Sequence, residues 1–148
     1  MPTLVDFETI PQLFDRLAKR YAGQPKAALG YKDKKAKQWA DISWDELVEQ
    51  VHAFAGYLRK EGVKKGDRVA ILSENRPEWA ITDLATQLLG AVNVPLYTTL
   101  PASQVGYILE DSGAKLLVVS VGLQLHEAGA VQGDRPDLRQ IVTMAVPR

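Results

Sequence analysis

Two polar segments that each follow a short apolar run carry the side chains best suited to bind a ligand. The first is SENRPEW, Ser73 to Trp79, in which Asn75 and Arg76 could meet an anion. The alternative is structural: Asn75 caps the next helix, Arg76 is solvated and Trp79 packs in the core. We favour the structural role, because Asn is among the residues preferred at helix N-caps.

The second segment is LYTTLP, Leu96 to Pro101, where Tyr97, Thr98 and Thr99 could hydrogen-bond a ligand. This loop contains no glycine. The alternative is that Thr98 or Thr99 helps to start a helix with Pro101 in its first turn. Here too we favour the structural role.

Motifs for phosphates, metals and nucleophilic catalysis are missing. No G-x-x-x-x-G-K-[ST] is present and no G-x-G-x-x-G follows an apolar run, so neither amide cradle for phosphates can be assigned. The histidines, His52 and His126, are far apart, and the pair His126-Glu127 lacks the second His of H-E-x-x-H. A Ser-His-Asp set stays open, but no G-x-S-x-G supports it. The sequence therefore predicts no catalytic, cofactor-binding or metal-ligating residue in this chain.

A cluster of lysines between aromatic residues, YKDKKAKQW from Tyr31 to Trp39, resembles patches that bind single-stranded nucleic acid. However, 18 Lys and Arg balance 18 Asp and Glu, so no net field attracts a polyanion. The pattern favours a solvated turn, with Trp39 and Trp44 packed under it, and we expect no nucleic-acid partner.

Composition is typical of one globular domain. Of the 148 residues, 46% are apolar and none is cysteine, which excludes disulfides and fits a reducing compartment. The N-terminus lacks the pattern of a secretory signal, and the apolar runs are far shorter than the ~20 residues that a membrane span needs. These features predict a cytoplasmic protein without a transmembrane segment.

Residues 1–66 predict a helix, a β-hairpin and a second helix. In the second helix Ser43 and Glu46 form the S-x-x-E capping box, which satisfies two orphan amide donors. The expected elements are a helix from about Pro11, hairpin strands at 27–32 and 37–44, and a helix from Ser43 to Gly62.

Residues 67–148 predict alternating strands and helices. The strand centres near Ala70, Val94, Val118 and Val142 are about 24 residues apart, which leaves room for one crossover helix each. The strands are expected at 68–73, 91–97, 115–121 and 139–146, and the helices at 76–90, 101–113 and 123–132. The fold class is therefore α/β, a parallel sheet of repeated βαβ units with helices on both faces, preceded by a helix and a hairpin.

The chain ends at Pro147-Arg148, directly after the fourth strand. A parallel sheet cut there leaves an edge or an apolar face open. We therefore expect a fragment of a longer protein, which forms homo-oligomers through Ile141 to Val146.

Two stretches resemble the adenylate-forming (AMP-binding) enzymes. ISWDEL, Ile42 to Leu47, is similar to their first core motif, and Gly66 to Val119 resembles the next stretch, including GA-x-x-VPL. SENRPEW and VPLYTTLPASQVGYILEDSGAK are most similar to long-chain fatty acyl-CoA synthetases. Related peptide-synthetase domains more often have Asp where Tyr97 stands.

The resemblance implies a ligase that uses ATP and Mg2+ to convert a fatty acid to an acyl-adenylate, and then transfers the acyl group to coenzyme A. The family's phosphate loop, its downstream Glu motif, its ribose-binding Asp and its mobile Lys have no counterpart in this sequence. We therefore expect a single N-terminal subdomain, 1–148, that is inactive alone, binds none of these cofactors and relies on the missing remainder for contact with fatty acid and CoA. The other hypothesis is a stand-alone flavodoxin-like binding or interaction module without catalysis.

Overall fold

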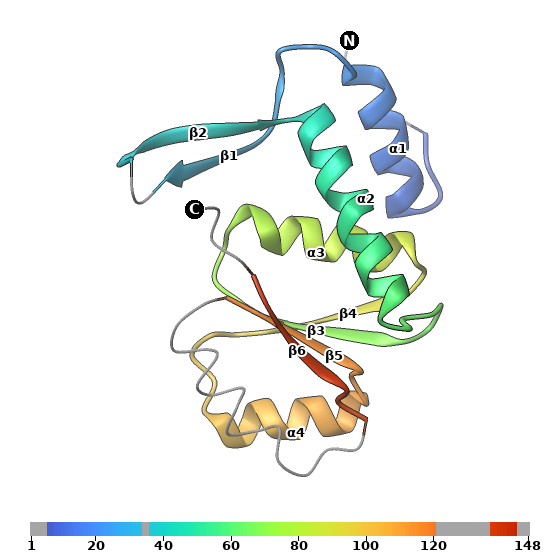
Figure 1. Ribbon diagram of the computed structural model, residues 1–148, viewed down its shortest axis with the longest axis vertical. Coiled ribbons are helices and arrows are strands. Elements are labelled where there is room, and N and C mark those ends of the chain that lie inside the picture. Colours follow the sequence, from blue (N-terminus) through green and yellow to red (C-terminus); the bar gives the residue numbers. More distant parts are fainter. Residues whose placement is uncertain (1–5, 34–35, 121–136, 145–148) are drawn as a thin grey trace.

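The computed structural model describes residues 6–33, 36–120 and 137–144; the helix expected at 123–132, with His126, lies outside them. A four-stranded sheet lies between helices, and a two-stranded hairpin projects from the N-terminal helical part of the molecule, away from that sheet (Figure 1). The elements are α1 (Ile10–Tyr21), β1 (Ala27–Asp33), β2 (Gln38–Ser43), α2 (Trp44–Lys60), β3 (Arg68–Leu72), α3 (Pro77–Leu88), β4 (Val92–Leu96), α4 (Ala102–Ser112), β5 (Leu116–Val119) and β6 (Gln140–Thr143).

Helix α1 begins where the sequence indicates. The Thr9 hydroxyl accepts a hydrogen bond from the Gln12 amide, and Pro11 occupies the first turn, where its missing N–H costs nothing. Phe14 is the buried residue of this helix.

The predicted hairpin is confirmed, with β1 and β2 antiparallel. The prediction for Trp39 is wrong: its side chain is 75% exposed and it pairs across the hairpin with Lys32. The physical reason is that the hairpin projects from the body of the protein, so the strands have no layer over this position (Figure 1). Trp44, by contrast, is partly buried and stacks on Tyr21 with ring centroids 5.4 Å apart.

The capping box at the start of α2 is confirmed. Ser43 Oγ accepts from the Glu46 amide at 3.3 Å, and Glu46 Oε2 accepts from the Ser43 amide at 2.8 Å. The bond from the Ser43 backbone lowers the pKa of Glu46. Spacing of three to four residues places Leu47, Val51, Ala55 and Leu58 on one buried face.

The large sheet is parallel, in the order β4-β3-β5-β6. The chain leaves β3 to form β4 on one side, and then crosses to the other side for β5 and β6. Leu72 at the end of β3 pairs with Leu96 on β4 and with Val119 on β5. The strand order therefore reverses between β3 and β5.

Alternate residues of the central strands face two separate cores. Val69 and Ile71 pack with α2 and α3, whereas Ala70 and Leu72 pack against α4 on the opposite face (Figure 1). The prediction of helices on both faces is confirmed for β3 and β5. The outer strand β4 is less covered than predicted: Val92 at its start is 50% exposed, and among the described residues β4 pairs with β3 alone.

At the amino edge of the sheet, charged side chains connect the residues that precede the strands with one another and with the end of α4. Lys115 Nζ lies 2.7 Å from Asp67 Oδ1, and this bond lowers the pKa of Asp67. Arg68 donates from Nε to the Ser112 carbonyl at 2.6 Å and from Nη2 to the Gly113 carbonyl at 3.1 Å. A cation at the C-terminus of α4 complements the helix dipole.

Candidate functional site

The carboxyl edge of the sheet brings together the residues that directly follow its strands. Because Leu72 is in register with Leu96 and Val119, the next residues, Ser73, Tyr97 and Ser120, emerge at one level. Open α/β sheets bind ligands outside this edge, where the strand order reverses. The reversal here lies between Ser73 and Ser120.

A hydrogen-bonded cluster closes that point. Ser120 is completely buried, and its Oγ donates to Glu74 Oε2 at 2.6 Å. Ser73 Oγ donates to the Glu74 carbonyl at 2.9 Å. The Ser120 bond connects the end of β5 to the loop after β3, and the Ser73 bond lies within that loop.

Arg76 is occupied by carboxylates of its own chain. Its Nε and Nη2 donate to the two oxygens of Glu78 at 2.8 and 2.9 Å, and Nη1 lies 3.9 Å from Glu74 Oε1. Its side chain is 17% exposed, and the bond to Glu78 raises its pKa. Glu78 thus takes two of the five N–H donors that a guanidinium has, and the two carboxylates offset the positive charge that would attract a further anion.

The structure contradicts the predictions that the sequence made for Asn75 and Arg76. Arg76 itself is the N-cap of α3, without a side-chain capping bond, so the predictions that Asn75 caps the helix and that Arg76 is solvated are wrong. Arg76 is not solvated because its guanidinium pairs with both carboxylate oxygens of Glu78. The helix begins one residue later than predicted because Pro77, whose fixed φ suits the first helical position, starts it. Asn75 is exposed, and Trp79 packs partly buried against the core, as expected.

The LYTTLP loop makes a turn. The Leu100 amide donates to the Tyr97 carbonyl at 3.2 Å, and the Tyr97 side chain is 80% exposed. The N-cap of α4 is Pro101, without a side-chain cap, so the prediction that Thr98 or Thr99 starts the helix is wrong. The backbone of Pro101 is extended, with φ −67° and ψ 154°, and it leads into α4 without a side-chain cap.

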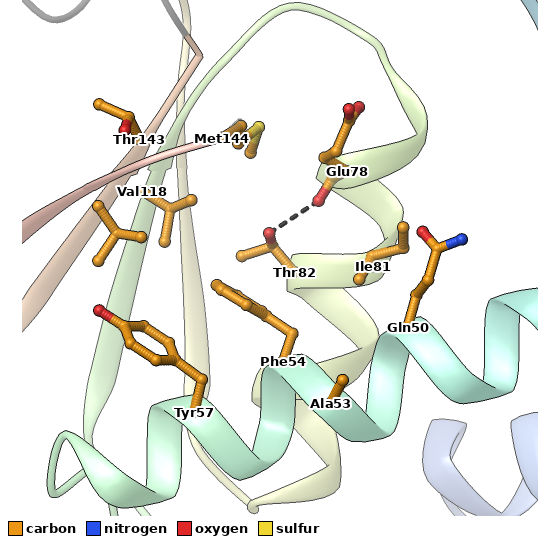
Figure 2. Close-up of a pocket in the computed structure, with 11 residues that line it drawn as sticks. Gln50, Ala53, Phe54, Tyr57, Glu78, Ile81, Thr82, Val118, Thr143 and Met144 are labelled. Atoms are coloured by element: carbon orange, nitrogen blue, oxygen red, sulfur yellow. Dashed lines mark hydrogen bonds between the residues drawn. The ribbon is translucent and has the colours of Figure 1, made fainter. Parts of the chain in front are cut away.

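A groove of about 440 Å³ lies between α2, α3 and the strands β5 and β6. Figure 2 shows Phe54 and Tyr57 on α2 facing Val118 and Met144 across it. Among the residues that the structure describes, its lining contains no Lys, Arg or His. The lining residues are Gln50, Ala53, Phe54, Tyr57, Glu78, Ile81, Thr82, Val118, Val142, Thr143 and Met144.

The described residues of the groove do not have the chemistry to hold phosphates or a metal ion. Phosphates need cations or converging amides, and Mg2+ needs several oxygen ligands. Across residues 6–33, 36–120 and 137–144, no three His, Cys, Asp or Glu side chains cluster closely enough to hold a metal. His52 is exposed on α2. In the same ranges, no helix combines the length and the apolar composition needed to cross a bilayer.

Sequence reasoning missed both the Glu74–Ser120 cluster and the groove. The cluster joins residues 46 positions apart, so only the pairing of β3 with β5 brings them together. A polar residue directly after each of two buried strands, Ser73 and Ser120, was the available signal. The groove depends on how α2 lies over β6, which no local pattern encodes.

The comparisons with known proteins point in one direction. The family model described as AMP-binding enzyme matches residues 14–147. Long-chain-fatty-acid–CoA ligase FadD15 of Mycobacterium bovis is 39% identical over 107 residues, which are 72% of this chain and 18% of that protein. The chain thus spans about a fifth of the length of the curated long-chain-fatty-acid–CoA ligases it matches.

Solved structures agree. The N-terminal domain of FACL13 from Mycobacterium tuberculosis superposes with a TM-score of 0.76 and 26% identity, over 93% of this chain and 34% of that one. The anthranilate CoA ligase AuaEII, in complex with anthranoyl-AMP, superposes with a TM-score of 0.82 over 95% of this chain and 26% of that one. At 24% identity, the second match shows the fold alone.

Proposed function

The chain belongs to the family of AMP-binding enzymes, and from this premise we propose that it is the N-terminal part of a long-chain fatty acid–CoA ligase. The observation that carries the proposal is the 39% identity to FadD15 over 107 residues. The reaction is the ATP-dependent activation of a fatty acid to an acyl-adenylate, followed by thioester formation with coenzyme A.

In this proposal the chain has a structural role, and the remainder of the enzyme contributes the catalytic and cofactor-binding residues. ATP, Mg2+ and coenzyme A would find no fitting site among the described residues, since Arg76 is bound to Glu78 and the groove is uncharged apart from that same Glu78. We therefore assign no catalytic or cofactor-binding residue to this chain. The LYTTLP turn shapes the edge of the sheet beside residues contributed from elsewhere.

The flavodoxin-like alternative has a similar topology but no other support. The order β4-β3-β5-β6 corresponds to the first four strands of the flavodoxin order 2-1-3-4-5. Topology alone therefore does not distinguish the two hypotheses. The match of the AMP-binding family over residues 14–147 favours the ligase.

Three narrower points belong to the same proposal. Residues 1–66 and 67–148 act as one unit, which is supported by a core that combines Phe14 and Val51 with Ile71 and Val118.

The isolated chain self-associates at β6, whose outer side has no partner strand in the described ranges. The protein acts in the cytoplasm, which is supported by a sequence without cysteine.

A chimeric enzyme tests the function. The segment of M. bovis FadD15 that matches this chain is replaced by residues 1–148, and palmitoyl-CoA formation from palmitate, ATP and CoA is measured. We expect turnover above that of FadD15 lacking the segment. A chimera that is folded by circular dichroism yet shows no turnover would contradict the proposal.

A further inference from the structure

A second and smaller groove lies between the C-terminal half of α2 and the end of α3. Its volume is about 260 Å³, and we call it the small groove. We propose that the small groove is a docking site for a second copy of this chain, which inserts Tyr107 of its α4. The proposal does not depend on the ligase function, since it uses only surfaces of this chain. The residues that line the small groove are His52, Ala55, Gly56, Arg59, Leu88 and Leu89.

The small groove has an apolar floor and a basic rim. Leu88 and Leu89 are half-buried, whereas Arg59 is exposed. Lys65 stands beside them, because its Cγ lies 3.1 Å from the place that a Cβ on Gly90 would take. Among the described residues, neither Arg59 nor Lys65 forms an ion pair. The fitting occupant is therefore an apolar side chain accompanied by carboxylates.

Gly56 lies in the small groove without a reason in the packing of its own chain. It stands inside α2, where glycine is less favourable than alanine. A Cβ at this position would meet no described atom within 4 Å, so the described part of the chain does not require glycine there. Close approach of another molecule to the helix backbone would require it.

The outer face of α4 carries an occupant of the matching kind. Tyr107 is 67% exposed, and the exposed residues Glu110 and Asp111 follow it at helical spacing on the same face. Carboxylates in the last turn of a helix oppose the helix dipole. Among the residues that the structure describes, neither of the two forms an ion pair. The stability of α4 therefore does not explain them, whereas contact with Arg59 and Lys65 of another copy would.

The contact joins two copies in a head-to-tail arrangement. Helix α4 covers the face of the sheet that carries Leu117 and Val119, whereas α2 and α3 cover the opposite face (Figure 1). Tyr107 therefore cannot reach the small groove of its own chain, and each copy offers one groove and one α4 face. The volume of the small groove is below the range of about 300–1,000 Å³ that is usual for small-molecule pockets, which favours an anchoring side chain over a free ligand.

Photo-cross-linking of the 148-residue chain tests the contact. With p-benzoylphenylalanine in place of Tyr107, irradiation should join position 107 of one copy to residues 52–59 or 88–89 of another, and mass spectrometry of the peptides locates the link. Links from position 107 to residues 140–146 would show that α4 meets β6 instead and would overturn the proposal.

Charge reversal makes the test specific. Arg59→Glu and Asp111→Arg, both at exposed positions, should each lower the yield of the cross-link at least about tenfold, because like charges then face each other. Lys32→Glu, at an exposed position of the hairpin, makes the same change of charge as Arg59→Glu and should leave the yield unchanged. Circular dichroism checks that the variants are folded.

A mixture of two variants separates a broken contact from a damaged chain. The cross-linker chain that carries Arg59→Glu should not link to itself. It should link to an added, isotopically labelled chain that carries Asp111→Arg, because the small groove of that second chain is intact. A mixture of folded variants without this link would contradict the head-to-tail contact.

Gly56→Leu fills the small groove with a residue that favours helix, so it should abolish the cross-link without unfolding the chain. Equal yields for wild type, Arg59→Glu and Gly56→Leu would overturn the proposal. A chain that gives no cross-link but binds vesicles of phosphatidylglycerol, and loses this binding in Arg59→Glu, would assign the small groove to a lipid surface and would overturn it as well.

Discussion

Ser120 Oγ donates a hydrogen bond to Glu74 Oε2 at 2.6 Å, between residues 46 positions apart in the chain. The bond crosses the point where the strand order reverses and joins β5 to the loop that leads into α3. Because Ser120 is completely buried, water cannot replace this partner easily.

We expect Ser120→Ala to lower the free energy of unfolding by about 1.5–3 kcal/mol, the range for losing a hydrogen bond to a charged group. Chemical denaturation measures the change. Ser103→Ala, at an exposed position of α4, is the control and should shift the midpoint little. Equal midpoints for both variants would show that the Ser120 bond contributes nothing to stability.

Ser43→Ala removes half of the capping box of α2. The expected loss is about 0.5–2 kcal/mol, the range measured for N-cap serines. Ser43→Asp keeps an acceptor for the Glu46 amide and should retain most of the stability in the same denaturation experiment. If alanine and aspartate are equivalent at this position, the cap does not stabilise the helix.

The Asp67–Lys115 pair predicts a pH dependence. The hydrogen bond from Lys115 lowers the pKa of Asp67 in the folded state, so the pair contributes stability above the unfolded pKa of about 4. That contribution is lost as the pH falls through the folded pKa, because protonation removes the carboxylate.

Asp67→Asn should therefore cost about 1–2 kcal/mol at neutral pH and progressively less below about pH 4. Unfolding midpoints measured from pH 7 to acid check this. Asp111→Asn, at an exposed position of α4, is the comparison. A difference between wild type and Asp67→Asn that stays constant over this range would contradict the assignment.

Replacing each of two glycines by alanine should change the stability of the protein in opposite directions. Gly113 ends α4 with φ 58°, and a Cβ there would lie 2.7 Å from Arg68 Nη2, so Gly113→Ala should destabilise by about 1–2 kcal/mol. Gly56 lies within α2 with open space around it, so Gly56→Ala should stabilise by about 0.5–1 kcal/mol. Thermal unfolding of both variants tests the pair, and a shift of the same sign in both would contradict it.

The isolated chain should not form an acyl-adenylate. With palmitate, ATP and magnesium, pyrophosphate exchange is expected at the level of a no-protein control, because the chain carries no phosphate-binding motif. Exchange clearly above that control would show that a nucleotide site exists within residues 1–148.

Features with local causes were predictable from the sequence. The S-x-x-E box located the start of α2, and the regular spacing of apolar runs located four parallel strands. Features that depend on competition between side chains were not. Asn75 is a good N-cap by preference, yet α3 begins at Pro77, and Arg76, whose side chain pairs with Glu78, occupies the N-cap position. For Trp39 nothing local reveals that the hairpin projects away from the core.

The hydrogen bond between Gln140 and Tyr57 joins residues 83 positions apart. At a synthesis rate of about 5–20 residues per second, the ribosome needs roughly 4–17 s to add those residues. During this interval the aromatic face of α2 has no β6 to pack against. Nascent chains would thus present Phe54 and Tyr57 to other apolar surfaces for seconds, so we expect the yield of folded protein to depend on translation speed and on chaperones that bind this helix.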